Sequence, residues 1–394
     1  MDGLQALWGF ALAAIVALAA TPLAARVSRR LGAIDEPKER GLHERPVPRL
    51  GGPAILVAVL AGGAPFLLPG TGQTQAILIG AVAITIVGAV DDVLGLHPAL
   101  KLAGQAGAAA VPVLAGVWVA HFTLPLIGAV DLSRPVGSAL TLLAIVAVMN
   151  MVNFSDGADG LAAGVCTIAA ITFAIIAISL SRYGAGVLAA VTAGAAAGFL
   201  WHNFHPAKIF MGDSGSNLLG LLLACVAIQG VLKTAAVVAL AFPLVIMAVP
   251  ILDTGFVVAK RIKYRRPVYR ADSWHFHHRF ANIGFSQRRT VLYLYGWTAS
   301  LAALALSLRF VPYSDGHGDF DPAWTSVLFA FGAVAVAASV YLVYVLEILK
   351  FRRFRERQLR RVGADDGGRP TDGEIEAKIV REVETGEFEA IGRD

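Results

Sequence analysis

The chain has 394 residues, of which 56% are hydrophobic and only 15% are charged, and its mean hydropathy is +0.66. Soluble domains carry about 25% charged residues, so this composition excludes a soluble domain and indicates a protein that crosses a membrane several times. The formal net charge is +5. Membrane proteins concentrate Lys and Arg in cytoplasmic loops, so topology accounts for this charge and we expect no nucleic-acid partner.

A helix that spans a bilayer needs roughly 17 to 25 mostly apolar residues. Eleven segments meet this requirement, although Lys101 and Gln105 interrupt the fourth. In chain order they are 4–27, 50–69, 75–93, 99–119, 137–154, 160–181, 186–203, 214–232, 235–259, 290–310 and 323–349. We therefore predict an all-α polytopic membrane protein with a membrane domain over 1–350. The tail, 351–394, mixes charges without an apolar stripe, which predicts partial disorder or a short surface helix.

Basic residues assign each loop to one side of the membrane. The loop 26–49 holds seven Lys and Arg residues, and the loop 260–289 holds nine. The alternate loops, 70–74, 119–136, 182–185, 233–234 and 309–322, hold only four in total. We therefore expect the two basic loops and the tail to be cytoplasmic and the amino terminus to lie outside.

The polar motifs of the sequence all fall on the predicted cytoplasmic side. They occupy 35–52, 91–92, 153–160, 201–216 and 269–279. Acidic residues of the predicted outer loops are scattered by comparison. Because an active site must gather its groups on one side of the membrane, this distribution predicts an active-site cleft on the cytoplasmic face.

Asp91 and Asp92 end an apolar segment, 77–90. Neighbouring residues on a helix point about 100° apart, so one carboxylate can face a metal ion or phosphate while the other supports it. A helix cap or turn is the structural alternative. Carboxylates are unfavourable at the negative end of a helix dipole, and this favours a functional role for the pair.

Polar residues recur at every third position in the next motif: Asn150, Asn153, Asp156 and Asp159. A spacing of three drifts around a helix, so these residues cannot share one face of a single helix. Gly157 and Gly160 predict that the helix ends near Ser155. Aspartate and glycine are common in simple turns, but irregular backbone at membrane depth is tolerated only beside a cavity or inside protein. We expect Asp156 and Asp159 beyond the break, and Asn150 to be a helix-packing residue.

Two further motifs contain groups suited to phosphate chemistry. Asp213 lies between Gly212 and Gly215, and Mg²⁺ prefers one or two carboxylates together with phosphate oxygens. Ser214 and Ser216 have helix capping as their alternative role. The histidine motif contains His275, His277, His278 and Arg279. Its basic surroundings disfavour zinc and favour a phosphate clamp, while a basic loop at lipid headgroups is the alternative.

Five motifs carry a resemblance to a known superfamily, over about residues 30–290. They are His43-Glu-Arg-Pro-Val-Pro-Arg-Leu-Gly-Gly52, Asp91-Asp-Val-Leu-Gly-Leu96, Asn153-Phe-Ser-Asp-Gly-Ala-Asp-Gly-Leu161, Phe210-Met-Gly-Asp-Ser-Gly-Ser216 and His275-Phe-His-His-Arg279. Together they resemble the polyprenyl-phosphate N-acetylhexosamine-1-phosphate transferase superfamily. The single motifs are weak signals, but five in the same order on one face are a specific one.

The resemblance implies transfer of a sugar 1-phosphate from a UDP-N-acetyl-amino sugar to undecaprenyl phosphate, with release of UMP. It also implies a need for Mg²⁺, with Mn²⁺ as an alternative, and a place in the bacterial inner membrane at the first membrane step of an envelope polysaccharide. Membrane lipids would surround the protein, and a homodimer is left open.

The resemblance also implies roles for single residues. Asp91 matches the base that prepares the lipid phosphate, Asp92 supports it and binds metal, and Asp156 is the third catalytic residue. Asp213 matches the metal ligand. The implied substrate-binding residues are Asn153, Asp159, Asn203, His43, His275, His277, His278 and Arg279, with uracil assigned to Asp159 and Asn203.

The histidine motif discriminates between branches of the superfamily. His-Phe-His-His-Arg is similar to the branch that uses UDP-N-acetylglucosamine, whereas the phospho-N-acetylmuramoyl-pentapeptide branch has three consecutive histidines. Ala158 and the pair Trp201-His202 depart from the pattern and leave the sugar open. The pentapeptide transferase is one alternative, and a transporter of an anionic substrate is the alternative from another class. A transporter would place its site near the midplane, within repeated segments.

Overall fold

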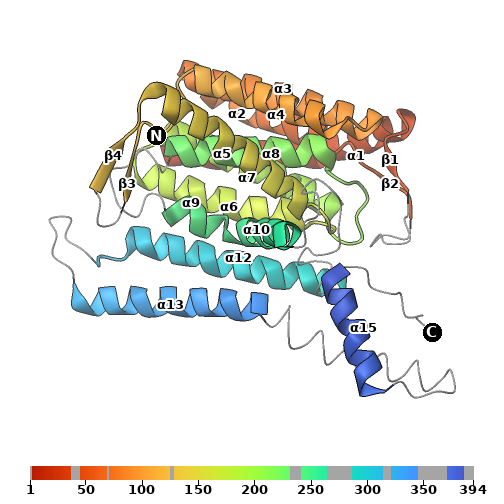
Figure 1. Cartoon of the computed structure of the whole chain (residues 1–394). Helices are drawn as coiled ribbons and strands as arrows, with labels where there is room; N and C mark the ends of the chain where they lie inside the picture. Colours follow the sequence, from red (N-terminus) through yellow and green to blue (C-terminus); the bar gives the residue numbers. More distant parts are fainter. Residues whose placement is uncertain are drawn as a thin grey trace.

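The computed structural model describes residues 2–36, 45–68, 71–124, 128–230, 241–263, 286–313, 321–344 and 371–385. These residues form mostly helices whose axes run in nearly the same direction, as a bundle (Figure 1). The helices are α1 (Asp2–Arg30), α2 (Gly52–Leu67), α3 (Gly72–Leu94), α4 (Pro98–Leu114), α5 (Arg134–Ser155), α6 (Leu161–Ser179), α7 (Tyr183–Asn203), α8 (Gly212–Gly230), α9 (Ala241–Ile246), α10 (Ala248–Lys263), α12 (Gln287–Phe310), α13 (Pro322–Tyr344) and α15 (Asp372–Thr385).

Seven of the described helices are long and apolar enough to cross a membrane, and α2 is a shorter apolar helix. The seven are α1, α3, α5, α6, α7, α12 and α13. The protein is therefore a mostly helical, multi-pass membrane protein. The first eight predicted segments each contain one helix, α1 to α8, while the count of eleven spans and their orientation stay predictions.

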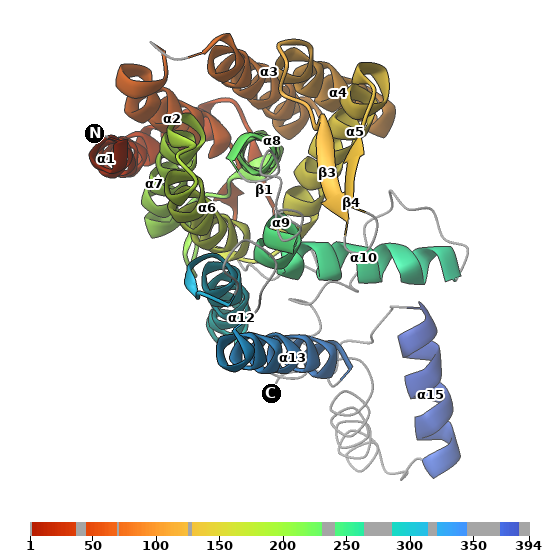
Figure 2. The same cartoon turned by 90° about the vertical axis from the view of Figure 1, so that its left-hand side faces the viewer.

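The prediction of a single helix over the ninth segment, 235–259, is wrong. Its described part is divided between α9 and α10 at Met247. Pro250 explains the division, because proline has no backbone N–H and its ring clashes with the carbonyl group four residues earlier. Figure 2 looks along most helices of the bundle and shows α10 lying across them.

Two short antiparallel strand pairs were not predicted. β1 (Ile34–Asp35) pairs with β2 (Val47–Pro48), with Ile34 opposite Pro48. β3 (His121–Leu124) pairs with β4 (Gly128–Asp131), with Leu124 opposite Gly128. The first pair extends the loop between α1 and α2 beside the start of α8, since the Phe210 N–H donates to the Pro48 carbonyl at 2.8 Å.

Helix α8 lies in the middle of the bundle, with α3, α5, α6 and α7 around it (Figure 2). Its leucines Leu218, Leu219 and Leu222 have no exposed surface, as expected for a helix that is apolar on all sides. A Cβ atom at Gly88 would lie 2.4 Å from the Ser214 Cα atom. Glycine at that position therefore allows α3 to approach α8 closely, and this brings their polar ends together.

The tail forms helix α15 over Asp372–Thr385, which is the helical alternative predicted for this region. Ile375 and Ile379 are buried and lie four residues apart on one face, so the expectation that the tail has no apolar stripe is wrong for this helix. The proposed boundary at residue 350 stays a prediction.

Candidate active site

Polar residues from four helices meet at one end of the bundle. Asp91 and Asp92 lie in the last turn of α3, and Asn153 lies in the last turn of α5. Asp213 lies in the first turn of α8, and Lys101 in the first turn of α4. The structure therefore brings together the predicted motifs at 91–92, 153–160 and 210–216, and Arg49 of the motif 43–52 joins them through its ion pair with Asp92.

Lys101 forms ion pairs with two carboxylates. Its Nζ atom lies 3.2 Å from Asp91 Oδ2 and also contacts Asp213 Oδ2. The other oxygen of Asp91 accepts a 2.7 Å hydrogen bond from the Leu96 N–H. The Asp213 side chain is 22% exposed, so a substrate can reach it. Two carboxylates from distant parts of the chain thus share one cation.

Asp92 is occupied by protein groups, and none of its side-chain surface is exposed. Its oxygens accept hydrogen bonds from the Asp213 N–H (2.9 Å), the Ser214 N–H (3.1 Å) and the Ser214 hydroxyl (2.8 Å). Arg49 lies 3.1 Å away as its ion-pair partner. The first N–H groups of a helix have no partner within it, so Asp92 caps α8. These contacts show that Asp92 positions the start of α8. The catalytic and metal-binding roles predicted for Asp92 stay predictions.

Gly212 lets the chain enter α8 beside Asp92. Its φ is +66°, in the left-handed region that glycine adopts without steric cost. A Cβ atom there would lie 2.5 Å from Asp92 Oδ2 and 2.1 Å from the Arg49 carbonyl oxygen. No larger residue fits this turn without displacing Asp92 or the backbone at Arg49.

The predicted helix break is confirmed. Helix α5 ends at Ser155, and α6 begins at Leu161. Before the break, Asn153 Nδ2 donates to Asp213 Oδ1 at 2.6 Å and to Ser216 Oγ at 2.8 Å. Asn153 therefore orients Asp213 in this structure, and its predicted contact with substrate stays a prediction.

Asp156 lies just beyond the break, outside the membrane-spanning helices. Burial raises the pKa of its carboxyl group well above the ordinary value, and the negative charges of Asp213, Asp92 and Asp159 raise it further. A carboxyl group with a raised pKa is typical of an acid or base in an active site. This supports the catalytic role predicted for Asp156, which stays a prediction.

Asp159 and Asn203 bind the loop after α7 to the start of α6. Asp159 Oδ2 lies 2.8 Å from His205 Nδ1 and accepts from the Ala207 N–H at 3.0 Å. Asn203 is 1% exposed, and its amide accepts from the Gly160 N–H and donates to the Ile209 carbonyl. Both ends of this amide have protein partners, so its contacts are structural here. Uracil binding by either residue stays a prediction.

Three basic side chains of this region had no predicted role at the site: Lys101, Arg49 and His205. Lys101 was treated as an interruption of an apolar segment, and Arg49 was counted for topology and quoted within the motif 43–52 without a role of its own. The signal for Lys101 was present, because an ionisable residue in a membrane segment is a functional hypothesis by default. Nothing in the sequence spacing linked it to Asp213.

His43 and the histidine motif lie outside the described residues. The phosphate clamp predicted for His275, His277, His278 and Arg279 therefore stays a prediction. Further along the chain, the guanidinium group of Arg288 at the start of α12 lies 5.8 Å from the centre of the Phe204 ring. A cation from α12 thus approaches the loop that Asp159 holds.

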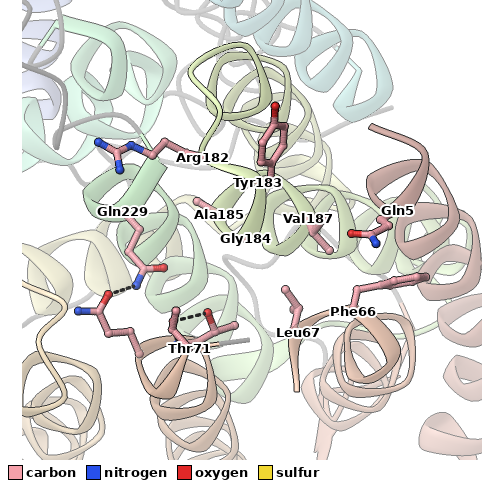
Figure 3. A pocket seen from close by; sticks show the side chains of 12 residues that line it. Gln5, Phe66, Leu67, Thr71, Arg182, Tyr183, Gly184, Ala185, Val187 and Gln229 are labelled. Carbon is pink, nitrogen blue, oxygen red and sulfur yellow. Dashed lines mark hydrogen bonds between the residues drawn. The ribbon is translucent and has the colours of Figure 1, made fainter. Parts of the chain in front are cut away.

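Within the described ranges, no group of three or more His, Cys, Asp and Glu side chains could hold a metal ion by itself. A cavity of about 390 Å³ lies at the other end of the bundle, beside the starts of α3 and α7 and the end of α8 (Figure 3). Its described lining includes Thr71, Arg182 and Gln229 but no carboxylate. The carboxylate cluster at the opposite end is therefore the better candidate for chemistry.

Comparison with known proteins gives a consistent result. The model of glycosyl transferase family 4 matches residues 74–231. A probable undecaprenyl-phosphate N-acetylglucosaminyl 1-phosphate transferase of Bacillus subtilis (strain 168) is 36% identical over 299 residues, 75% of this chain and 84% of that protein. A decaprenyl-phosphate N-acetylglucosaminephosphotransferase of Mycobacterium leprae (strain TN) is 39% identical, over 76% of this chain and 82% of that protein.

A relative from the other branch is also similar. The phospho-N-acetylmuramoyl-pentapeptide-transferase of Desulforudis audaxviator (strain MP104C) is 33% identical, over 68% of this chain and 86% of that protein. The region matched by the family model runs from the first turn of α3 to the end of α8 and contains Asp91, Asn153 and Asp213. The protein is thus a phosphotransferase and not a transporter. The chain belongs to glycosyl transferase family 4, in the branch of the polyprenyl-phosphate N-acetylglucosamine-1-phosphate transferases.

Proposed function

We propose that the protein transfers N-acetylglucosamine 1-phosphate from UDP-N-acetylglucosamine to undecaprenyl phosphate, in a reaction that requires Mg²⁺. An oxygen of the lipid phosphate attacks the phosphorus atom that bears the sugar. The bond from that phosphorus to the oxygen of UMP then breaks. The products are undecaprenyl-diphosphate-N-acetylglucosamine and UMP.

The observation that carries this proposal is the pair of carboxylates that share a cation, Asp91 and Asp213 around Lys101. A reaction between two anions requires positive charge where they meet. The names of the B. subtilis and M. leprae relatives support N-acetylglucosamine as the sugar, and they name different polyprenyl phosphates as the acceptor.

The residues present fit Mg²⁺. Mg²⁺ is usually bound by one or two carboxylates together with substrate phosphates, and Asp91 and Asp213 already lie on either side of one cationic group. Asp213 would hold the ion together with phosphate oxygens of the substrate. When bound, it would neutralise charge on the diphosphate and on the leaving UMP.

The protein groups would orient the substrates and move one proton. Asp91 would accept the proton of the lipid phosphate, so that its oxygen becomes a better nucleophile. Asn153 keeps Asp213 oriented through the 2.6 Å hydrogen bond to Oδ1. Lys101 would add positive charge beside the reacting phosphates.

The site would face the cytoplasm of a bacterium, in the inner membrane, and the reaction would be the first membrane step of an envelope polysaccharide. The basic loop 26–49 supports this orientation. The residues that follow this loop form backbone hydrogen bonds with the start of α8, where Asp213 lies. The Gly51 N–H donates to the Phe210 carbonyl, and the Gly52 N–H to the Met211 carbonyl.

The test is an assay of UMP release by the purified full-length protein with Mg²⁺ and either undecaprenyl or decaprenyl phosphate. UDP-N-acetylglucosamine, UDP-N-acetylgalactosamine and UDP-N-acetylmuramoyl-pentapeptide are compared as donors, with Mn²⁺ and EDTA in parallel. We expect UMP only with UDP-N-acetylglucosamine and none in EDTA. Release with the pentapeptide donor alone would place the protein with the D. audaxviator relative, and an unchanged rate in EDTA would contradict the metal requirement.

A further inference from the structure

Three amide side chains form a connected network inside the bundle. Asn150 Nδ2 donates to Gln105 Oε1 at 2.9 Å, and Gln105 Nε2 donates to Asn217 Oδ1 at 2.8 Å. The three residues come from α5, α4 and α8. Gln105 and Asn217 are each 1% exposed. Three helices are therefore joined by side-chain hydrogen bonds within an apolar interior.

Each amide lies about one helical turn from a residue of the active site. The pairs are Gln105 and Lys101 on α4, Asn217 and Asp213 on α8, and Asn150 and Asn153 on α5. Residues three or four apart lie on the same side of a helix. The amides thus form a layer directly beneath the ion pairs, and Asn217 Nδ2 also donates to the Asp213 carbonyl at 2.7 Å.

Packing alone does not require amides here. Hydrogen-bonded groups in an apolar interior can often be replaced together by apolar groups at little cost in stability. Apolar surfaces, however, tolerate sliding, whereas a buried amide pair fixes the register of two helices. Register matters at this point because Lys101 on α4 must reach two carboxylates that α3 and α8 carry.

We propose that Gln105, Asn150 and Asn217 are positioning residues for the transfer reaction. They fix the register of α4 against α5 and α8, and this keeps Lys101 between Asp91 and Asp213. None of the three needs to touch the substrate. The proposal rests on the proposed function, since the transfer reaction supplies its readout.

The test compares three variants of the full-length protein: Gln105→Met, Lys101→Met and the double variant. Methionine keeps the length of glutamine without its hydrogen bonds. We expect Gln105→Met to lower kcat by about 10- to 100-fold, as misplacement of a reacting group does, with little change in the KM for the sugar nucleotide. Because both changes act on the same cation, the double variant should be no slower than Lys101→Met alone.

A matched control is available at the other end of α8. Gln229 Nε2 donates to Gln73 Oε1 at 3.1 Å, and Figure 3 draws this bond at the cavity. Gln229 lies at the end of α8, whereas Asp213 lies in its first turn. Gln229→Met removes a hydrogen bond of the same type between α8 and α3. We expect its kcat to equal that of the wild type. The thermal midpoint of every variant, measured in detergent, separates a loss of folded protein from a loss of positioning.

The proposal fails if Gln105→Met has the kcat of the wild type, or if its effect multiplies with that of Lys101→Met. If Gln105→Met does not fold, Asn150→Ala removes the two hydrogen bonds between Asn150 and Gln105, of 2.9 and 3.4 Å, and is tested against Lys101→Met in the same way. A radiolabelled sugar nucleotide keeps low rates measurable. Absence of UMP release by the wild type would contradict the proposed function instead, so the two failures are distinct.

Discussion

Asp91 and Asp213 are connected through a single ammonium group, so the charge of each carboxylate matters more than its shape. The changes Asp91→Asn and Asp213→Asn keep the size of the side chain and remove the charge. We expect UMP release to fall by about 10²- to 10⁴-fold for Asp91→Asn, the range for the loss of a general base, and at least as far for Asp213→Asn. The measurement is UMP release at saturating donor.

Asp131→Asn is the control for this pair, because Asp131 is an exposed carboxylate at the end of β4, just before α5 and at the opposite end of α5 from Asn153. Its activity should equal that of the wild type. Full activity in Asp91→Asn or Asp213→Asn, at wild-type thermal stability, would remove that residue from the site.

Asp156 gives a prediction about pH. Its pKa is raised by burial and by the nearby carboxylates, so the folded protein binds its proton more tightly than the unfolded chain does. Stability then falls as the pH rises from the ordinary carboxylate value, about 3.9, to the raised value. Asp156→Asn removes this effect. We expect the variant to have a higher thermal midpoint than the wild type at neutral pH in metal-free detergent solution, and the difference to shrink as the pH falls.

The alternative result for Asp156 is equally clear. If the difference in midpoint between Asp156→Asn and the wild type is the same at pH 5 and pH 8, the proton of Asp156 is not linked to folding. The same pair of proteins tests catalysis. If the reaction needs the ionised carboxylate of Asp156, the activity of the wild type must rise with pH through the raised pKa of Asp156. The rise should be absent from the variant.

At the scale of helices, the site depends on how closely α3 approaches α8. Gly88→Ala places a methyl group 2.4 Å from the Ser214 Cα atom, which forces the helices apart at the turn beneath Asp91 and Asp92. Overpacking of this kind lowers the free energy of unfolding by about 1–3 kcal/mol. We expect the rate of UMP release to fall as well, because the carboxylates on the two helices move apart. Gly107→Ala on α4 is the matched control, because a Cβ atom there meets nothing within 4 Å. Equal activity in the two variants would contradict this account.

Helices were easier to predict than the contacts between them. The apolar segments and the break after Ser155 follow from local composition, so the sequence was sufficient for α1 to α8. Pro250 was visible too, and treating 235–259 as one span gave too little weight to the loss of its N–H group. By contrast, the bond from Asn153 to Asp213 depends on which face of α5 turns toward α8, and one sequence does not determine that.

In the site, too, the sequence predicted which residues belong together but not the contacts between them. The sequence predicted that Asp91, Asn153 and Asp213 belong together because they share a side of the membrane. It did not distinguish Asp92 as a cap of α8 from Asp91 as an ion-pair partner, since both stand at the same helix end. Lys101 was missed because its partners lie on two other helices, at sequence distances of 10 and 112 residues.

For the whole molecule, single introduced cysteines can test which end of the helical bundle faces the cytoplasm. Both native cysteines, Cys166 and Cys225, are buried, so a membrane-impermeant maleimide should label introduced cysteines selectively. Glu36 is exposed beside β1, at the end of the bundle that holds the site, and Ser133 is exposed at the start of α5, at the opposite end. We expect Ser133→Cys to be labelled in intact cells stripped of their outer layers, and Glu36→Cys only after the membrane is permeabilised.

This pattern follows from the basic residues around the site end, which membrane insertion retains in the cytoplasm. A cysteine added after Asp394 should behave like Glu36→Cys if the number of spans is odd. The reverse pattern for Glu36→Cys and Ser133→Cys would place the carboxylate cluster outside, where UDP-sugars are not supplied, and would contradict the proposed donor. Labelling of the tail in intact cells, with the other two results as expected, would leave the site in the cytoplasm and change only the number of spans after α8.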